Sequence, residues 1–335
     1  MVIHPKLLLD VLLVKQRKES QMDHGQLSMV AEKFQWVFSE TLRNTCGKDT
    51  KFCRRQRTMT PFRLGLALTA TCASHRVETL ADFHRGFHAL FDTTLTYKAF
   101  SNQLAQPHFA TFMGPMASRL LGELPLKVLG FAKGRALAEF RHLVIQDGSA
   151  FAIHDALREV CPGRFKTVKP AAVELPTTMD LLCDAPPTVV LTPDTTNDQA
   201  FLPEPATLRG RLLLAERGYL DWHYLRRGQD AGGFLLIRAK AGRNPQVVEA
   251  FREDGKRPRS LRNKPLKAIH AKLPKRQRVE LVVTWQVEAY TLRLRLRISW
   301  HRRTQEFCSL VTNLPAKRSH LDMLYRAYKW RWPVA

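Results

Sequence analysis

Hydrophobic and polar positions along the chain predict helices before about residue 130 and mainly strands after residue 140. A helix-like opening and a second amphipathic segment at Leu27 to Leu42 come first. Between Thr60 and Leu129, apolar residues recur at helical spacing, and glycine or proline punctuates the pattern. We therefore expect a helical amino-terminal region over residues 1–135, followed by a sheet-containing region over residues 136–335.

Within the helical region, the stretch from Val77 to Leu104 follows a helix, turn, helix pattern. Thr79 precedes the first expected helix and Thr94 precedes the second, and threonine is a favoured residue at a helix start. The spacing permits a DNA-binding helix-turn-helix motif, whose second helix enters a DNA groove. An ordinary pair of helices has the same pattern, so both interpretations stay open.

The sheet-containing region begins with the stretch from His142 to Ser149. Leu143 to Gln146 is a short apolar run with β-branched residues, and Asp147 and Gly148 follow it directly. The run predicts a buried strand that ends at Asp147. A carboxylate at that point could meet a ligand or a metal ion, although an aspartate that caps a turn has the same signature.

Further strands and a short helix alternate after this point, which indicates an α/β or α+β domain with mixed strands. The short helix is expected at Asp155 to Val160. Strands are expected at Ala171 to Leu182, Thr188 to Leu191, Leu212 to Ala215 and Phe234 to Ile237. Pro176 lies within the first of them and predicts an edge position or a bulge, because proline has no N–H to donate to a neighbouring strand.

A β-hairpin and a final helix are predicted near the end of the chain. Apolar residues alternate with polar ones over Val279 to Val287 and over Leu292 to Ile298, with a short connection between them. The apolar side would face the core, and the other side carries Arg293, Arg295 and Arg297. Ser319 and Asp322 form a capping-box pattern at the start of an amphipathic helix.

The charge changes this picture most. The chain has 53 Lys and Arg against 30 Asp and Glu, a formal net charge of +23, with an isoelectric point near 10.2. Such an excess favours a polyanionic partner, most commonly nucleic acid. A soluble protein that is merely basic is the alternative, and an anionic membrane surface is less favoured because no basic amphipathic helix stands out.

Two segments hold much of the excess. Arg43 to Arg63 contains seven Lys or Arg and one acid, and it could be a phosphate-tracking arm or a solvated linker face. Arg238 to Arg278 contains 14 Lys or Arg and three acids. With the arginine strand beside it, this second segment favours a DNA-facing surface over a solvated loop.

The six cysteines form no C-x-x-C pair and have no histidine partners at zinc spacing, which predicts free thiols in a reducing compartment. The apolar run Leu7 to Val14 contains Asp10 and carries its positive charges mostly after it, so it fits neither a signal peptide nor a membrane span. We expect a cytoplasmic or nucleoid-associated protein with no membrane partner.

The chain contains no glycine-rich phosphate loop, G-x-S-x-G elbow or H-E-x-x-H helix, which argues against nucleotide hydrolysis, serine hydrolysis and zinc proteolysis in their common forms. Carboxylates at strand ends remain. Glu216 follows the run Leu212 to Ala215 as Asp147 follows its own strand. Two acids at neighbouring strand ends could hold divalent metal for phosphodiester chemistry, usually with a third acid.

Four groups of residues, in order, resemble the DDE transposases of the insertion sequence 4 family, over roughly residues 60–335. The groups are Asp147-Gly148-Ser149 with His154-Asp155-Ala156-Leu157, Pro170 to Leu175, Leu213 to Tyr219, and Tyr328-x-x-Arg331-Trp332. The resemblance implies an RNase H-like catalytic domain over residues 136–335, with a β-rich insertion at about residues 233–313.

It also implies Mg²⁺- or Mn²⁺-dependent DNA strand cleavage and transfer, as a homodimer on double-stranded DNA. The DNA would be terminal inverted repeats, held by the helical amino-terminal domain, and a target. Asp147 matches the first catalytic aspartate, and Glu216 stands where the family has its second. The residues expected to contact DNA are Arg238, Lys240, Arg243, Arg293, Arg295, Arg297, Tyr328 and Arg331.

The third acid of the family is a glutamate, seven positions after the motif tyrosine. Counting from Tyr328 leads to Ala335, which cannot ligate metal, and Pro333 would bend the helix just before it. Pro176 also stands where many relatives have histidine. The chain is therefore expected to be a transposase cut short, with DNA binding retained and strand transfer weak or absent. A non-catalytic DNA-binding remnant and a basic RNA-binding protein are the alternatives.

Overall fold

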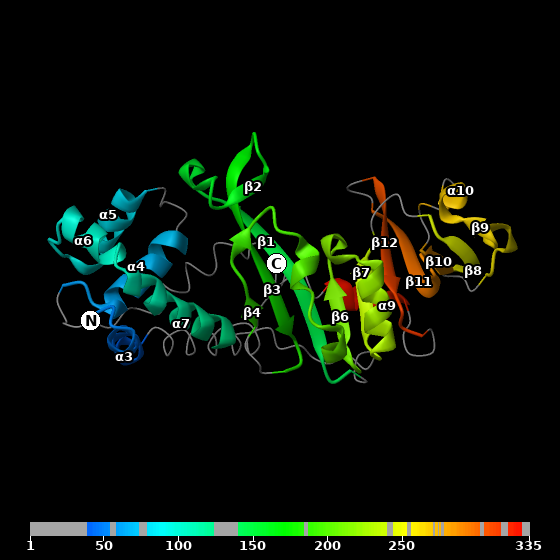
Figure 1. Cartoon of the computed structure of the whole chain (residues 1–335), viewed down its shortest axis with the longest axis horizontal. Coiled ribbons are helices and arrows are strands. Elements are labelled where there is room, and N and C mark those ends of the chain that lie inside the picture. The colour runs from blue at the N-terminus through cyan, green and yellow to red at the C-terminus, as the bar shows by residue number, and fades with distance from the viewer. Residues whose placement is uncertain are drawn as a thin grey trace. The chain divides into compact units, whose positions relative to one another are not determined.

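The computed structural model describes residues 39–53, 58–73, 79–123, 140–183, 187–239, 244–252, 256–270, 272–273, 275, 278–301, 305–315 and 321–329. The chain divides into two compact units, Met1–Gly130 and Phe131–Ala335. The described part of the first unit is helical, and the second is built around one large mixed sheet (Figure 1). The expectation of a helical region followed by a mixed α/β region is confirmed at this level.

The first unit is a set of helices packed around phenylalanine side chains. Phe87, Phe100 and Phe112 are fully buried, together with Leu64. The helices are α3 (Glu40–Asp49), α4 (Pro61–Ala73), α5 (Leu80–Phe91), α6 (Tyr97–Leu104) and α7 (Pro107–Glu123). The helix predicted at Leu27 to Leu42 lies mostly outside the described residues.

Helices α5 and α6 form the predicted helix, turn, helix pair. Thr79 caps α5 through a capping box with Asp82, as its position in the sequence predicted. The second helix is capped by Thr96 and not by Thr94, because the Thr96 hydroxyl is the one that reaches the amide of Ala99. The pair is therefore present, and the second helix spans Tyr97–Leu104, the residues that the sequence pattern indicated.

The first residue of the basic segment Arg43 to Arg63 is buried, so the segment is not solvated along its whole length. Arg43 is 3% exposed, and burial lowers the pKa of its guanidinium to about 10. A side chain at Gly65 would collide with that guanidinium, so the glycine makes room for it. Arg43 belongs to the helical core and does not track phosphates from the surface.

The sheet of the second unit contains twelve strands among the residues that the structure describes. They are β1 (Leu143–Ala152), β2 (Pro162–Phe165), β3 (Lys169–Asp180), β4 (Thr188–Val189), β5 (Thr192–Pro193), β6 (Leu212–Ala215), β7 (Phe234–Arg238), β8 (Gln246–Arg252), β9 (Lys264–Pro265), β10 (Val279–Val287), β11 (Tyr290–His301) and β12 (Glu306–Thr312). The sequence predicted the longer inner strands and missed β2, β5, β8, β9 and β12.

Among the residues that the structure describes, the helices beside the sheet are α9 (Trp222–Asp230), α10 (Leu266–His270) and α11 (Leu321–Lys329). Single 3-10 turns are η2 (Asp155–Leu157), η3 (Asp198–Phe201), η4 (Pro205–Leu208), η5 (Arg217–Tyr219) and η6 (Arg259–Leu261). The helix predicted at Asp155 to Val160 is the first of these turns. Ser319, predicted to cap α11, lies outside the described residues.

The strand order is β2-β3-β1-β6-β7-β12-β11-β10-β8-β9, with β4 and β5 paired to β3 (Figure 1). β1 and β3 are antiparallel, whereas β6 is parallel to β1 and β7 is parallel to β6. The remaining strands, from β12 to β9, are all antiparallel to their neighbours. Since β7 is part of the parallel centre, the antiparallel extension begins at Gln246 and not at residue 233.

β1 does not end at Asp147, contrary to the prediction. It continues through Gly148 to Ala152, because β3 pairs with it along its whole second half, as far as Ala152↔Ala172. Only the pairing with β6 stops, at Gln146↔Ala215. Asp147 therefore lies inside a strand on its β3 side and at the end of the ladder on its β6 side.

Pro176 lies in β3 without a bulge, between β1 on one side and the short strands β4 and β5 on the other. Its carbonyl accepts the N–H of Val190, so its nitrogen faces the same side. There the neighbouring chain is interrupted between β4 and β5. The interruption lets an inner strand accommodate proline, which the edge-or-bulge prediction did not anticipate.

The predicted hairpin is confirmed as β10 and β11, paired from Val279↔Ile298 to Val287↔Tyr290. The turn is Glu288-Ala289, and Glu288 has a positive φ of 51°. Helix α9 covers the apolar face, where the rings of Trp222 and Trp285 lie 4.3 Å apart.

The arginine face of the hairpin is covered as well. The Arg297 guanidinium lies 4.5 Å from the ring centre of Tyr325 in α11. Arg295 donates to Glu280 at 2.5 Å and to the Leu314 carbonyl at 2.9 Å. Both arginines are buried, at 7% and 3% exposed, so the sheet is a layer between helices on its two faces.

Among the described helices, none combines the length and the apolar character that a membrane crossing requires. Cys161, Cys183 and Cys308 are free thiols of intermediate exposure.

Candidate functional site

The candidate site lies beside the ends of β6 and β7, at the point where the parallel pairing of β1 with β6 stops. Asp147 is the residue after the pair Gln146↔Ala215, and Glu216 is its counterpart on β6. Arg238 occupies the same position on β7, directly after the pair Ala215↔Ile237. Because side chains alternate across a strand and neighbouring strands lie about 4.8 Å apart, all three side chains emerge side by side on one face of the sheet. The sequence predicted two acids at neighbouring strand ends, and the register of β1 and β6 provides that arrangement.

Glu216 is held by groups from three directions. Its Oε2 accepts the N–H of Arg217 at 2.9 Å, where it caps η5. Its Oε1 accepts the hydroxyl of Tyr328 at 2.9 Å and lies 3.8 Å from Nη1 of Arg238. The tyrosine comes from α11, which is 112 residues away in the chain. The Tyr328 hydroxyl and the Arg238 guanidinium therefore fix the orientation of the Glu216 carboxylate.

Asp147 is more enclosed than Glu216, at 7% exposed. Its Oδ1 accepts the N–H of Gly148 at 3.0 Å. Gly148 has no room for a side chain, because a Cβ there would lie 2.4 Å from Oε1 of Glu174 and 3.1 Å from the hydroxyl of Tyr219. The glycine after Asp147 is therefore explained by the close approach of these two groups and not by a turn.

A second group of acids lies on the other face of the sheet, around Arg164. Arg164 Nη2 contacts Asp198 Oδ1 at 3.0 Å and Glu174 Oε2 at 3.5 Å. The backbone N–H of Arg164 donates to Asp194 Oδ2 at 3.0 Å. Glu174 and Asp194 are both buried, so one cation is shared among three carboxyl groups.

The crowding and burial of this group shift the pKa values of Glu174 and Tyr219. Burial, followed by the nearby charge of Asp198, raises the pKa of Glu174, and Asp194 and Asp147 act in the same direction while Arg164 opposes them. Burial is also the main cause that raises the pKa of Tyr219 to about 12. The Tyr219 hydroxyl therefore stays protonated beside the acids over the physiological range.

The sequence did not single out this second group. Glu174, Asp194 and Asp198 are dispersed over β3 and the segment after β5, and only the fold gathers them. One signal was available: Glu174 is a charged residue inside an otherwise buried strand, which is rare unless the charge is paired.

The residues predicted to contact DNA divide into four sets. Arg293 is exposed, at 64% of its side chain, and pairs with Glu249 at 3.1 Å. Arg295 and Arg297 are buried, the latter against Tyr325 of α11, so neither belongs to the exposed basic surface. Lys240, Arg243 and Arg331 lie outside the described residues, as does Ala335, and Arg238 and Tyr328 lie at Glu216.

A basic surface is nevertheless present in the antiparallel extension, between Lys256 and Arg278. The exposed cations of this segment, among the described residues, are Lys256, Arg257, Arg259, Arg262, Lys264, Lys267, Lys272, Lys275 and Arg278. We call them the basic extension. Several of them are placed against the protein: Lys275 lies 4.5 Å from the ring centre of Trp300, and Arg257 lies 5.1 Å from that of Phe251.

The fold and the site define a two-unit protein, with a helical unit and a mixed α/β unit that presents two acids at adjacent ends of parallel strands. No protein-family model matches the chain, and no curated protein matches it.

Proposed function

We propose that this protein is a DDE-type transposase, similar to the insertion sequence 4 family, that binds transposon-end DNA through an RNase H-like unit and a helical unit. The observation that carries the proposal is the contact between Tyr328 and Glu216. The two residues belong to the last two motifs of the resemblance, which are far apart in the sequence. The Tyr328 hydroxyl contacts the carboxylate that stands at the position of the family's second acid.

The strand order supports the RNase H-like part of the proposal. Such a fold has three antiparallel strands followed by two that run parallel to the first, in the spatial order third, second, first, fourth, fifth. Here β4 and β5 together, β3, β1, β6 and β7 have that order and those directions, and the short strand β2 is an addition that pairs with the start of β3. We propose that the antiparallel extension after β7 corresponds to the family's β-rich insertion.

Asp147 and Glu216 are the residues that would hold Mg²⁺ or Mn²⁺. Carboxylate oxygens are the ligands that these hard cations prefer, and the two acids lie at adjacent register positions on one face. When bound, the ion would activate the attacking oxygen and stabilise the leaving oxygen of a phosphodiester. Within the protein, Tyr328 and Arg238 orient Glu216, and the Gly148 N–H orients Asp147.

The third acid is the weak point of the proposed chemistry. Ala335 stands at the position of the family's glutamate, and a methyl group cannot ligate a metal ion. Glu216 is also one methylene longer than the aspartate expected at its position. We therefore propose retained binding of duplex DNA, as a homodimer, with weak or absent strand cleavage. A non-catalytic protein that occupies transposon ends is the alternative that Ala335 favours.

The test combines binding and cleavage on the same DNA. Duplexes selected by the full-length protein from a random-sequence pool should yield a recurrent terminal sequence that is preferred over RNA at matched salt. Asp147→Ala should leave that binding unchanged, because the basic surface and not the carboxylate makes the phosphate contacts. No preferred duplex, or a preference for RNA, would contradict the proposal that the protein binds transposon ends.

Cleavage separates the two candidate functions. Nicking of the selected duplex that requires Mg²⁺ and is lost in Asp147→Ala would show an active transposase. Nicking that is absent or unaffected by Asp147→Ala, together with intact binding, would identify the non-catalytic protein. Glu159→Ala is the matched control, since it removes an exposed carboxylate at a distance from the site.

A further inference from the structure

A second set of possible metal ligands lies at the other end of β1, five residues before Asp147. His142 directly precedes β1, Asp180 is the last residue of β3, and Cys183 follows three residues later. Because β1 and β3 are antiparallel, the start of one strand meets the end of the other, with Val144 opposite Asp180. At a strand rise of about 3.3 Å per residue, this corner is roughly 16 Å from Asp147.

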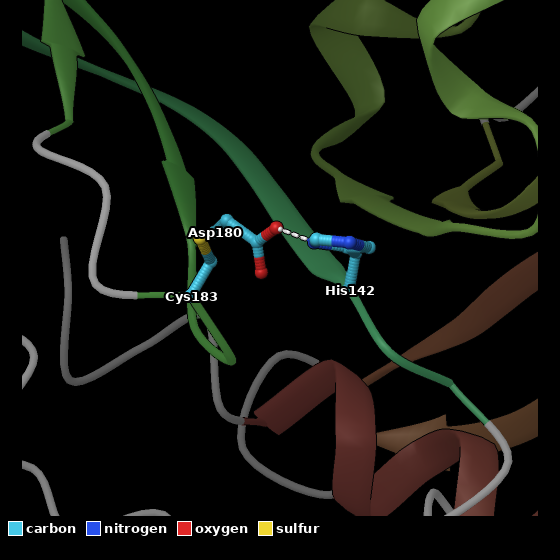
Figure 2. A group of neighbouring side chains, drawn as sticks. All are labelled: His142, Asp180 and Cys183. Carbon is cyan, nitrogen blue, oxygen red and sulfur yellow. Dashed lines mark hydrogen bonds and ion pairs between the residues drawn. The ribbon is translucent and has the colours of Figure 1, made fainter.

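The three side chains converge at this corner, as Figure 2 shows. His142 Nδ1 lies 2.6 Å from Asp180 Oδ2. One ligand atom from each residue, a ring nitrogen, a carboxylate oxygen and the thiol sulfur, lies within 4.8 Å of the other two. All three residues are partly buried, so the group is enclosed but still open to an entering ion.

The backbone fixes the central ligand. Asp180 Oδ1 accepts the N–H of Leu143 at 3.1 Å and the N–H of Leu182 at 3.0 Å. These two bonds hold the carboxylate across the corner, and Oδ2 is left facing His142. The turn at Leu181 and Leu182 then returns the chain so that Cys183 lies beside the carboxylate, with the spacing D-x-x-C.

From this arrangement we infer that His142, Asp180 and Cys183 form a binding site for a single Zn²⁺ ion. Zn²⁺ accepts nitrogen, oxygen and sulfur ligands together at about 2.0–2.3 Å in a tetrahedral arrangement, and a thiolate among the ligands selects it against Mg²⁺. The carboxylate and the thiolate balance the charge of the ion. Water would complete the fourth position, and the thiol proton leaves to solvent on binding.

The movement needed to close the site is small. Ligand atoms around a tetrahedral Zn²⁺ lie about 3.3–3.6 Å apart, given bond lengths of about 2.0–2.3 Å. The His142–Asp180 pair must open slightly from 2.6 Å, and the sulfur must move inward by about 1 Å from the 4.8 Å limit. Bound in this way, the ion would fasten the end of β3 to the start of β1, the strand that carries Asp147.

The experiment uses the reduced, chelator-treated full-length protein with excess Mg²⁺ present, so that carboxylate sites are occupied. Co²⁺ is the probe, because a cobalt–thiolate bond gives a charge-transfer absorption that carboxylate ligands cannot give. One equivalent of Co²⁺ should produce this absorption, and Zn²⁺ should remove it by displacement. Absence of the absorption would overturn the inference.

Variants assign the absorption to this corner. Cys183→Ser and His142→Gln should each weaken Co²⁺ binding by at least about tenfold, since even outer contacts of metal ligands have effects of that size. Cys161→Ser makes the same chemical change at another partly exposed thiol of the same unit, and it should retain the absorption. Asp147→Asn should retain it too, which separates this site from the proposed catalytic acids.

A measurement on the unmodified protein guards against variants that fail to fold. Zn²⁺ should slow alkylation of Cys183 by iodoacetamide, followed peptide by peptide with mass spectrometry, and should leave alkylation of Cys161 unchanged. Equal rates at Cys183 with and without Zn²⁺ would overturn the site, whatever the variants show.

Discussion

At the scale of single residues, Gly148 separates two groups of acids. Asp147 precedes it and emerges on one face of the sheet, while Glu174 and the Tyr219 hydroxyl approach its Cα from the other face. The two groups remain electrostatically linked, because the charge of Asp147 contributes to the raised pKa of Glu174. The sequence predicted Gly148 to mark the end of a strand. In the structure, its lack of a side chain lets the two groups of acids lie on opposite faces of the sheet at this point.

Glu174 should make stability depend on pH. Its ordinary pKa is 4.5, and in the folded protein the pKa is raised, first by burial. Between these two values the folded state holds a proton that the unfolded chain has lost, so stability falls as pH rises through this window and does not fall further above it. The Glu174→Gln variant has no carboxyl group to titrate at this position, so its stability does not fall in this way. Relative to wild type, its free energy of unfolding should therefore increase from about pH 4.5 to neutral pH, as measured by urea denaturation.

The matched control is Glu159→Gln, at a carboxylate that is 86% exposed. This variant should change the free energy of unfolding by less than about 0.5 kcal/mol at either pH. A constant difference between Glu174→Gln and wild type across the window would contradict the raised pKa of Glu174.

At the scale of elements, the hairpin of β10 and β11 illustrates how a correct pattern can be misassigned to a surface. Strict alternation predicted both strands and their pairing, and the register confirms them. Alternation also placed three arginines on the face opposite the apolar one, which suggested a DNA-facing row. Helix α11, from the end of the chain, covers that face and contacts Arg297 through Tyr325. Distance along the sequence concealed this contact.

Arg295 should accordingly support the fold. Its side chain is 8% exposed and pairs with Glu280 at 2.5 Å. Arg295→Met keeps the length of the side chain but leaves Glu280 without its cation, so unfolding should require about 3 kcal/mol less free energy. Arg293→Met, on the same strand but 64% exposed, should cost no more than about 1 kcal/mol. Equal losses in chemical denaturation would show that the burial of Arg295 does not matter to stability.

At the scale of the whole molecule, the cations behind the net charge of +23 are divided between buried and exposed positions. Arg43, Arg295 and Arg297 are enclosed within the two units, whereas the basic extension is exposed along the segment from Lys256 to Arg278, which contains η6, β9 and α10. We therefore assign the proposed phosphate-binding surface to the basic extension, at the far end of the antiparallel strands, and not to the arginines of β11. Each unit has a hydrophobic core of its own.

The salt dependence of DNA binding tests this location. Lys264→Gln with Lys267→Gln removes two exposed cations of the basic extension. The slope of log affinity against log salt should decrease in magnitude by about 1.8, at about 0.9 per lost phosphate contact, over about 50–200 mM salt. Arg158→Gln with Lys166→Gln makes the same change in net charge at exposed positions elsewhere in the unit, and should leave the slope unchanged. Equal slopes for the two double variants would mean that total charge, and not this surface, drives binding.

The sequence by itself determined the local features of this protein. Alternation specified β10 and β11, the apolar run specified β6, and the threonine at position 79 specified the start of α5, because each depends on neighbours a few residues away. It also indicated Asp147 and Glu216 as acids that follow apolar strands.

Only the tertiary structure decided which distant residues meet. The parallel register of β1 and β6 sets Asp147 beside Glu216, α11 brings Tyr328 to that carboxylate and buries Arg297, and antiparallel pairing gathers His142 with Asp180. Contacts of this kind depend on strand order and on the face that each helix covers. Hydrophobic periodicity is the same for every such arrangement, so it could not choose among them.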